Sequence, residues 1–240
     1  MKNIIFLLCM ILILFGTYTG IRGSSASTKV INLVALGDSI THGVGDPTNE
    51  GYIEGVKEKL EEVHKTPIKV SNFAIPRYST DKVLEQLQDK KINAQIKKGK
   101  YIILYIGTND FRKSANYQFN PLDVKRINDG KVRFTTNLTK ILESIRKNNS
   151  AAPIFVLGLY QPYVEYANRE EILSTIKDWN DEIVKVADHF DQTYFVATLD
   201  LFQEKPKSTY FSDSLHPNPA GYQLIAERVS ETVLKELSLN

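Results

Sequence analysis

Hydrophobic residues in this 240-residue chain gather in five short runs, each followed by a longer segment with a different spacing. The runs are six or seven residues long, and four of them are almost continuously apolar, which predicts strands buried on both faces. The run at 68–73 is half polar. The five runs cover Val30–Leu36, Ile68–Phe73, Tyr101–Ile106, Pro153–Leu159 and Tyr194–Leu199. Such strands are typical of a parallel sheet covered by helices on both sides, so the pattern predicts a three-layer α/β/α domain.

Between these runs, apolar residues recur every three or four positions, which predicts amphipathic helices. The helices are expected over Glu50–Lys65, Thr80–Ile96, Lys131–Lys147 and Arg169–His189, with a last one that begins at Asn218-Pro219. In parallel sheets of this kind, ligands bind beyond the carboxyl ends of the strands. The residues that follow each strand are therefore the candidates for function.

Polar residues follow several of the predicted strands. Ser39 comes after the first, Ala74–Arg77 after the second and Asn109 after the third, while Asp213 and His216 stand in the loop after the fifth. Taken singly, these are ordinary turn, capping or surface residues. Together they supply the hydroxyl nucleophile, imidazole base, orienting carboxylate and amide donor that acyl transfer needs. Because Asp213 and His216 are three residues apart, the carboxylate can reach Nδ1 and leave Nε2 for Ser39.

Three segments resemble sequence blocks of the SGNH, or GDSL, hydrolase family: GDSIT at 37–41, GTND at 107–110 and DSLHPNPAGY at 213–222. The blocks occur in the family's order and span nearly the whole chain after its first 26 residues. The resemblance implies a flavodoxin-like sheet of strand order 2-1-3-4-5 and hydrolysis of esters without a metal or cofactor. By position, it makes Ser39 the nucleophile, His216 the base, Asp213 the partner of that base and Asn109 an oxyanion donor.

One block departs from the family pattern N-x-G-x-x-G, because Ala74 and Arg77 occupy the two glycine positions. In the family, the backbone N–H of the second glycine joins that of the nucleophile as an oxyanion donor. Arg77 can supply this N–H if its backbone geometry is allowed for a residue with a Cβ. Together with Arg112 and Lys113, the guanidinium of Arg77 would place three cations at the edge of the sheet where the strands end. The alternative is plain exposure to solvent.

Two loops near the same edge are rich in aromatic residues and are candidates for the wall of an acyl pocket or a partial lid. The residues concerned are Phe111, Tyr117, Phe119 and Leu122 in segment 111–130, and Tyr160, Tyr163 and Tyr166 after the fourth strand. The alternative, favoured for most of them, is that they only pack the loops onto the domain.

The first 26 residues resemble a secretory signal, with Lys2 before an apolar run over Ile4–Gly16 and then small and polar residues. The run is short for a membrane span, which needs roughly 20 apolar residues. An uncleaved anchor formed by residues 4–20 is the alternative. We therefore expect a secreted or extracytoplasmic protein with one domain over residues 27–240, associated with a membrane through the N-terminal segment only.

Charge and cysteine content exclude several kinds of partner. The only cysteine, Cys9, lies in the apolar run, so residues 27–240 contain neither a disulfide nor a cysteine-based metal site. Lys2 and Arg22 are two of the 30 basic residues, and all 28 acidic residues come later, so residues 27–240 carry no formal net charge. That balance does not favour nucleic-acid binding. No H-E-x-x-H motif joins the four histidines, and no metal is expected.

These observations favour an exported serine esterase or acylhydrolase that cleaves carboxylic esters or thioesters of small molecules or lipids. An O-acyltransferase or deacylase that acts on cell-envelope glycan would use the same side chains and differ only in its acceptor or substrate. A non-catalytic binding protein with a relic site is disfavoured, since all four groups of the predicted site are present.

Overall fold

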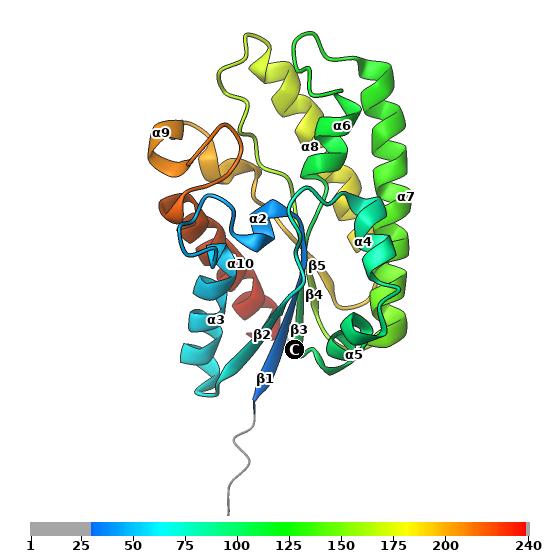
Figure 1. Ribbon diagram of the computed structural model, residues 1–240, viewed down its shortest axis with the longest axis vertical. Helices are drawn as coiled ribbons and strands as arrows, with labels where there is room; N and C mark the ends of the chain where they lie inside the picture. Colours follow the sequence, from blue (N-terminus) through cyan, green and yellow to red (C-terminus); the bar gives the residue numbers. More distant parts are fainter. Residues whose placement is uncertain (1–29, 239–240) are drawn as a thin grey trace, which may run out of the picture.

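The computed structural model describes residues 30–238, which fold around a five-stranded parallel sheet (Figure 1). Its strands are β1 (Ile31–Gly37), β2 (Ile68–Asn72), β3 (Tyr101–Tyr105), β4 (Ile154–Leu157) and β5 (Thr193–Val196). They lie in the order β2-β1-β3-β4-β5, and all four neighbouring pairs are parallel. The predicted strand order is therefore confirmed. The carboxyl ends of all the strands meet at one edge, the upper one in Figure 1.

Helices cover both faces of the sheet. The segments are α2 (Ser39–His42), α3 (Gly51–His64), α4 (Thr80–Gln86), α5 (Lys90–Lys98), α6 (Thr108–Ser114), α7 (Val124–Asn148), α8 (Arg169–Ala187), η1 (Leu199–Phe202), α9 (Lys207–Tyr210) and α10 (Pro219–Ser238). Figure 1 shows α3 and α10 on one side and α4, α5, α7 and α8 on the other. The three-layer α/β/α architecture is thus as the apolar pattern predicts.

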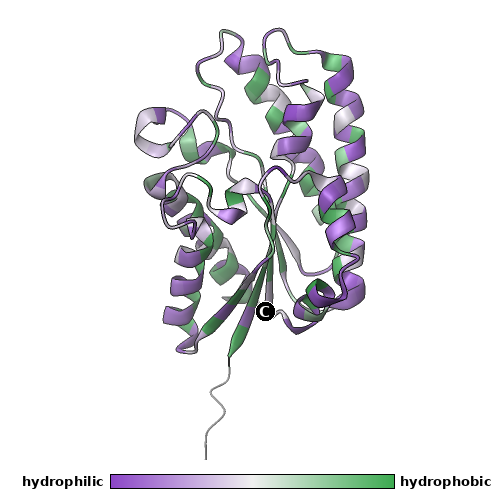
Figure 2. Cartoon of the chain, in the orientation of Figure 1, coloured by the Kyte–Doolittle hydropathy of each residue, from purple (hydrophilic) through white to green (hydrophobic). Residues whose placement is uncertain are grey.

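The core lies where the sequence is most continuously apolar. Residues Leu33–Leu36 of β1 and all of β3 are almost completely buried. Figure 2 shows the strands as mainly hydrophobic, while the helices carry hydrophilic residues on their outer faces. Because β1 and β3 are central, burial of their side chains anchors the segments that follow them. Those segments carry Ser39 and Asn109.

Helix boundaries differ from the sequence prediction at two places. The single helix expected over Thr80–Ile96 is two helices, because Asp89 interrupts it and accepts a hydrogen bond from the backbone N–H of Lys91 at 2.7 Å. The helix expected from Lys131 begins at Val124, where Asp123 caps the first turn by accepting from the N–H of Arg126 at 3.0 Å. Asn128, Asp129 and Gly130 are residues common in turns, so the first turns lack a clear helical pattern in the sequence.

Most of the aromatic residues proposed for a pocket wall or lid are packed inside the molecule. Phe119 stacks on Tyr163 with ring centroids 4.1 Å apart, and Phe111 meets the edge of Trp179 at 5.3 Å. All four of these side chains are buried, whereas 55 % of Tyr117 is exposed. Most of this group therefore packs the loops onto the domain, and Phe111, Tyr160 and Tyr163 in addition line a small cavity beside the His216 loop. Tyr117 is the exposed member of the group.

Candidate active site

Ser39 is held at the carboxyl end of β1 by a sharp change from strand to helix. Gly37 passes so close to β3 that a Cβ there would lie 2.3 Å from the carbonyl oxygen of Tyr105. Asp38 then caps α2, because its Oδ1 accepts from the N–H of Ile40 at 3.0 Å. Ser39 is the first residue of α2, and its own N–H donates to no acceptor among the described residues.

A chain of hydrogen bonds connects Ser39 to a loop 177 residues away in sequence. Nε2 of His216 lies 2.9 Å from Oγ of Ser39, and Nδ1 of His216 lies 2.7 Å from Oδ2 of Asp213. An ionised carboxylate only accepts hydrogen bonds, so Nδ1 carries the proton. In the neutral imidazole, Nε2 is then the acceptor for the Ser39 hydroxyl. The structure thus brings together the three residues predicted from their separate motifs.

Local hydrogen bonds fix the Asp213 carboxylate. Its Oδ1 accepts from the backbone N–H groups of Leu215 and His216, both at 2.7 Å. Partial burial tends to raise the pKa of Asp213, but these bonds and the His216 imidazole outweigh burial and lower it. Tyr160, from the loop after β4, donates its hydroxyl to the carbonyl of Leu215 at 2.8 Å. Asp213 therefore stays ionised while its loop is anchored from a second element.

Buried tyrosines and one asparagine support the Ser39 segment. Thr41 Oγ1 and the Tyr52 hydroxyl are 2.9 Å apart, and Tyr222 donates to the carbonyl of Val44 at 2.6 Å. Asn72 at the end of β2 donates to the carbonyl of Thr41 at 2.8 Å. The sequence analysis did not identify these supports. Asn72 is the asparagine of the N-x-G-x-x-G pattern and so had a signal, whereas single tyrosines inside helices have none.

Asn109 lies on the first turn of α6 and is almost fully buried. Its Nδ2 donates to the carbonyl of Tyr78 at 2.8 Å and lies 3.4 Å from Oδ2 of Asp38. One amide hydrogen therefore makes a normal hydrogen bond. The other amide hydrogen faces Oδ2 of Asp38, beside Ser39, where the hydrogen bond is long and weak.

Arg77 adopts the left-handed backbone conformation that favours glycine, with φ of +69°. Arg77 adopts this conformation although it has a Cβ. Its backbone N–H donates to no acceptor in the described part of the chain. Arg77 precedes Tyr78, the residue whose carbonyl holds Asn109, so the two predicted donors lie on neighbouring segments.

Asp38 is completely buried behind Ser39. Burial raises the pKa of its carboxyl to about 7, although the hydrogen bond from the N–H of Ile40 opposes the rise. Asp110 raises the value further and Arg112 lowers it. A buried acid that titrates near neutrality thus contacts the Asn109 amide.

The three cations of this edge have different surroundings. Lys113 donates to Oγ of Ser79 at 2.5 Å and faces Asp81 and Asp110. These residues surround a hollow separate from the cavity that Thr108 borders. Arg77 is exposed, and Arg112 is half-buried. Neither arginine forms an ion pair with any of residues 30–238.

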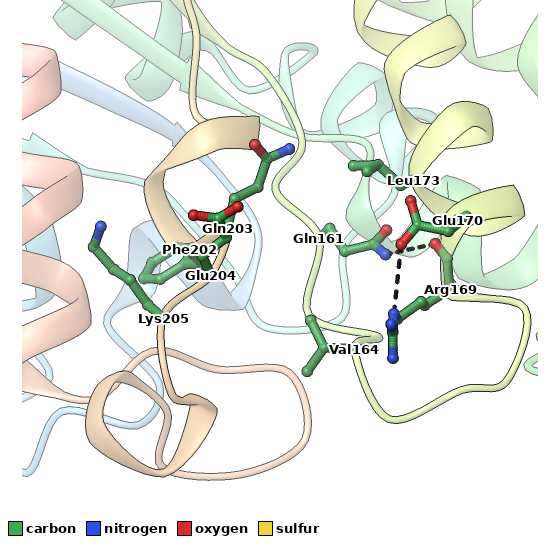
Figure 3. Close-up of a pocket in the computed structure, with 9 residues that line it drawn as sticks. All are labelled: Gln161, Val164, Arg169, Glu170, Leu173, Phe202, Gln203, Glu204 and Lys205. Atoms are coloured by element: carbon green, nitrogen blue, oxygen red, sulfur yellow. Dashed lines mark hydrogen bonds and ion pairs between the residues drawn. The ribbon is translucent and has the colours of Figure 1, made fainter.

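Two hollows lie near the loops that carry these residues. Thr108, Tyr160, Tyr163 and Leu215 are among the residues around a cavity of about 10 Å³ beside the His216 loop. A wider hollow of about 520 Å³ opens between the start of α8 and the segment after η1 (Figure 3). Gln161 and Phe202 line that hollow, but Ser39 and His216 do not.

Within residues 30–238, no three histidine, aspartate or glutamate side chains are grouped as a metal ion would require. In the same range, every helix is either too short or too polar to cross a membrane. The proposed signal or anchor over residues 1–26 lies outside the described residues.

Comparison with known proteins places this chain among the hydrolases of ester bonds. It belongs to the GDSL-like lipase/acylhydrolase family, whose sequence profile matches residues 35–224. The chain is 32 % identical over 243 residues to uncharacterized protein YpmR of Bacillus subtilis (strain 168), covering 96 % of this chain and 95 % of that protein. It is 26 % identical over 206 residues to the spore germination lipase LipC of Bacillus licheniformis, covering 83 % and 94 %.

Solved structures share the fold at lower sequence identity. The lipase Lip_vut3 from a goat rumen metagenome has a TM-score of 0.74 at 24 % identity, covering 84 % of this chain and 97 % of that one. A family 3 carbohydrate esterase of Clostridium thermocellum has a TM-score of 0.61 at 20 % identity, covering 88 % and 98 %. The acetylxylan esterase Axe2 of Geobacillus stearothermophilus has a TM-score of 0.65 at 18 % identity, covering 85 % and 94 %.

Proposed function

We propose that this protein is a serine esterase or acylhydrolase that cleaves carboxylic esters or thioesters with Ser39 as the nucleophile. The observation that carries the proposal is the continuous hydrogen-bond chain from Asp213 through His216 to Ser39, with distances of 2.7 and 2.9 Å. Nucleophile, base and orienting carboxylate are all within hydrogen-bond reach, as nucleophilic catalysis requires.

The geometry supports a two-step reaction. Oγ of Ser39 attacks the ester carbonyl while Nε2 of His216 accepts the hydroxyl proton, and Asp213 stabilises the imidazolium that forms. His216 then gives that proton to the leaving alcohol or thiol, which leaves an acyl group on Ser39. Water then attacks the acyl group while His216 accepts a proton from it, and His216 returns this proton to Oγ of Ser39 as the acyl–oxygen bond breaks and the carboxylic acid is released. No step uses a metal, so we expect EDTA to leave the activity unchanged.

Three donors are positioned to receive the oxyanion of the tetrahedral intermediate. The backbone N–H groups of Ser39 and Arg77 have no acceptor among residues 30–238. The third is the amide hydrogen of Asn109 that faces Asp38 Oδ2 across 3.4 Å. Because that contact is long, a developing oxyanion can compete for the hydrogen more easily than for the one bonded to Tyr78.

The substrate class is proposed from relatives as well as from the site. The similarity to the lipase LipC supports an ester of a lipid or small molecule. A second candidate is deacylation of a glycan, or transfer of an acyl group to one. The carbohydrate esterases among the proteins of similar fold support this candidate. Esters of graded acyl length, assayed beside an acetylated oligosaccharide, separate the two.

Labelling with a fluorophosphonate probe tests the nucleophile. The wild type should be labelled and Ser39→Ala should not, with turnover lowered by about 10⁶-fold. Ser214→Ala is the matched control, because this exposed serine lies in the His216 loop and should keep both labelling and turnover. Labelling that persists in Ser39→Ala, or more than about a tenth of wild-type activity, would exclude Ser39 as the nucleophile.

Export is proposed from residues 1–26 alone, on the basis of their charge and apolar pattern. Fractionation of producing cells tests it, together with the N-terminal sequence of the mature protein. We expect the protein outside the cytoplasm, either cleaved after the apolar run or retained on the membrane by it. An intact chain in the cytoplasmic fraction would contradict export.

A further inference from the structure

Arg112, on the second turn of α6, has a guanidinium that forms no ion pair within residues 30–238. The residue is half-buried, and its Nε is shielded from solvent without a hydrogen-bond partner. None of residues 30–238 accepts a hydrogen bond from it or forms an ion pair with it. Partial burial of a charge is unfavourable unless something compensates for the lost hydration. The partner that compensates here is therefore expected to come from outside the chain.

Other arginines of the chain show what a satisfied guanidinium looks like. Arg228 pairs with Asp200 through two nitrogens at 2.7 and 2.8 Å. Arg146 donates to the carbonyls of Ala152 and Gln192 at 2.6 and 2.8 Å, although its Nε, like that of Arg112, has no partner. Arg112 differs from both because it is half-buried, as they are, yet none of its nitrogens has an acceptor among residues 30–238.

The chain adopts an unfavourable backbone to place Tyr117 against Arg112. Asn116 and Tyr117 are consecutive residues in the left-handed region, with φ of +52° and +57°. The turn is closed by the N–H of Tyr117, which donates to the carbonyl of Arg112 at 2.9 Å. As a result, Cζ of Arg112 lies 5.3 Å from the centre of the exposed Tyr117 ring. Strain of this kind persists where the local arrangement has a use.

Helix geometry places Arg112 above the catalytic edge. Residues three and four apart share a helix face, so Arg112 lies one turn outward from Asn109 and Thr108. Thr108 borders the small cavity beside the His216 loop. The guanidinium is also close enough to Asp38, directly before Ser39, to lower the pKa of that carboxyl, against the larger effect of burial.

We propose that Arg112 is a specificity residue that binds an anionic group, a carboxylate or a phosphate, on the ester substrate. A guanidinium presents a planar fork of donors that matches either group, and a stacked aromatic ring holds that fork in place. The site therefore prefers esters that carry a negative charge near the scissile bond. This inference rests on the proposed esterase activity and adds the chemical class of its substrate.

Matched pairs of esters test the preference. 4-Nitrophenyl hemisuccinate and 4-nitrophenyl butyrate differ by a carboxylate in the acyl part. A monobutyrylglycerol phosphate and monobutyrylglycerol differ by a phosphate in the alcohol part. In Arg112→Gln, kcat/KM for the anionic member relative to the neutral one should fall by about tenfold in at least one pair, mainly through KM. Arg112→Lys should lose less, because it keeps the charge without the fork.

Lys98→Gln is the control for general charge, because Lys98 lies exposed at the opposite edge of the sheet, beside the start of β1. It should leave both ratios unchanged, and added salt should lower the preference of the wild type. Tyr117→Ala should weaken the preference in the same direction as Arg112→Gln. Ratios that stay the same in Arg112→Gln for both pairs would overturn the proposal and leave Arg112 with only an electrostatic effect on Asp38.

A binding measurement separates this inference from the proposed activity. Butyl phosphate and monobutyl succinate are each titrated calorimetrically into Ser39→Ala and into the same protein with Arg112→Gln added. The proposal expects at least one of the two anions to bind about tenfold more weakly to the double variant, whether or not the wild type hydrolyses any ester. Equal affinities for both anions would overturn it even if the wild type proves to be an active esterase.

Discussion

The two halves of the candidate site are held in opposite ways. The Asp213–His216 loop is fixed by short hydrogen bonds between near neighbours, all at 2.7 Å. The proposed oxyanion side is assembled from three distant segments, with Asn109 3.4 Å from Asp38 and Arg77 in a left-handed backbone. A local loop keeps its geometry through its own sequence, whereas the oxyanion side depends on how the strands place it. Substitutions in the two halves should therefore affect activity and stability differently.

The largest effect is expected in the local half, from Asp213→Asn. The amide can still accept from the two backbone N–H groups, but it can present Nδ2 to His216 and favour the wrong imidazole tautomer. We expect kcat to fall by about 10⁴-fold with the fold unchanged. Single-turnover kinetics and a thermal melt measure the two quantities.

The lowered pKa of Asp213 determines how the stability of its loop depends on pH. Because that pKa is lowered in the folded protein, the Asp213 hydrogen bonds stabilise the fold above the unfolded-state pKa and are lost as pH falls through the folded value. The loop should therefore stay folded in mild acid and lose this stabilisation only as pH falls through the lowered pKa of Asp213. Faster proteolysis at 211–217 already in mild acid would contradict this expectation.

The distant half should respond more weakly to Asn109→Ala. Loss of one transition-state donor is expected to lower kcat by about 10²- to 10³-fold while KM changes little. Michaelis–Menten measurements on a neutral ester separate the two constants. An effect mainly on KM would mean that Asn109 binds substrate and does not stabilise the oxyanion.

The contrast between the halves also explains how far the sequence could predict the site. Asp213 and His216 are three residues apart, and Ser39 lies two residues after a strand, so motif and spacing were sufficient to predict that these side chains lie together. Asn109 was predicted by its motif, but its contact with Asp38 joins residues 71 positions apart. No rule based on spacing in the sequence predicts a contact between residues so far apart.

The fold was predictable to a similar extent. Five short runs rich in apolar residues indicated the strands, and the resemblance to the family implied their order. The short helix α6 was missed because it is only seven residues long. The early start of α7 was missed because its first turns lack a clear helical pattern in the sequence. The stacking of Tyr117 on Arg112 needs two left-handed residues, and neither Asn116 nor Tyr117 is a glycine that would have indicated them.

Asp38→Asn tests the buried acid of the oxyanion side through the pH dependence of stability. The folded-state pKa of Asp38, about 7, is above its unfolded value, so this group stabilises the fold in acid. That contribution is fully present below the unfolded pKa and is lost as pH rises through about 7. Denaturant unfolding from pH 4 to 8 should show wild-type stability declining by a few kcal/mol more than that of the variant.

Asp110 has a pKa raised chiefly by burial and contributes a slope of the same sign in both proteins. The difference between wild type and Asp38→Asn therefore isolates Asp38, with Arg112 and Asp110 as the charges that face it. Identical slopes in the two proteins would show that Asp38 stays ionised throughout this range. In that case the Asn109 amide faces a charged acceptor at every pH.

The smallest effect is expected at Arg77, where the chain departs from its family. Arg77→Gly keeps the backbone N–H and removes the cost of holding a Cβ at φ of +69°, about 1 to 2 kcal/mol. The greater freedom of glycine in the unfolded chain offsets much of that gain. We therefore expect the free energy of unfolding to change by less than about 1 kcal/mol. Turnover of a neutral short-chain ester should be unchanged or slightly higher.

Arg77→Ala separates backbone from side chain, because it removes the guanidinium and keeps the Cβ. If the N–H alone matters, both variants should turn over the neutral ester like the wild type. Thermal melts and kcat on 4-nitrophenyl butyrate supply the comparison. A tenfold loss in Arg77→Gly with normal activity in Arg77→Ala would mean that the rigid, left-handed backbone itself is needed to aim the donor. The oxyanion side would then depend on the strain at residue 77 as the other half depends on its short hydrogen bonds.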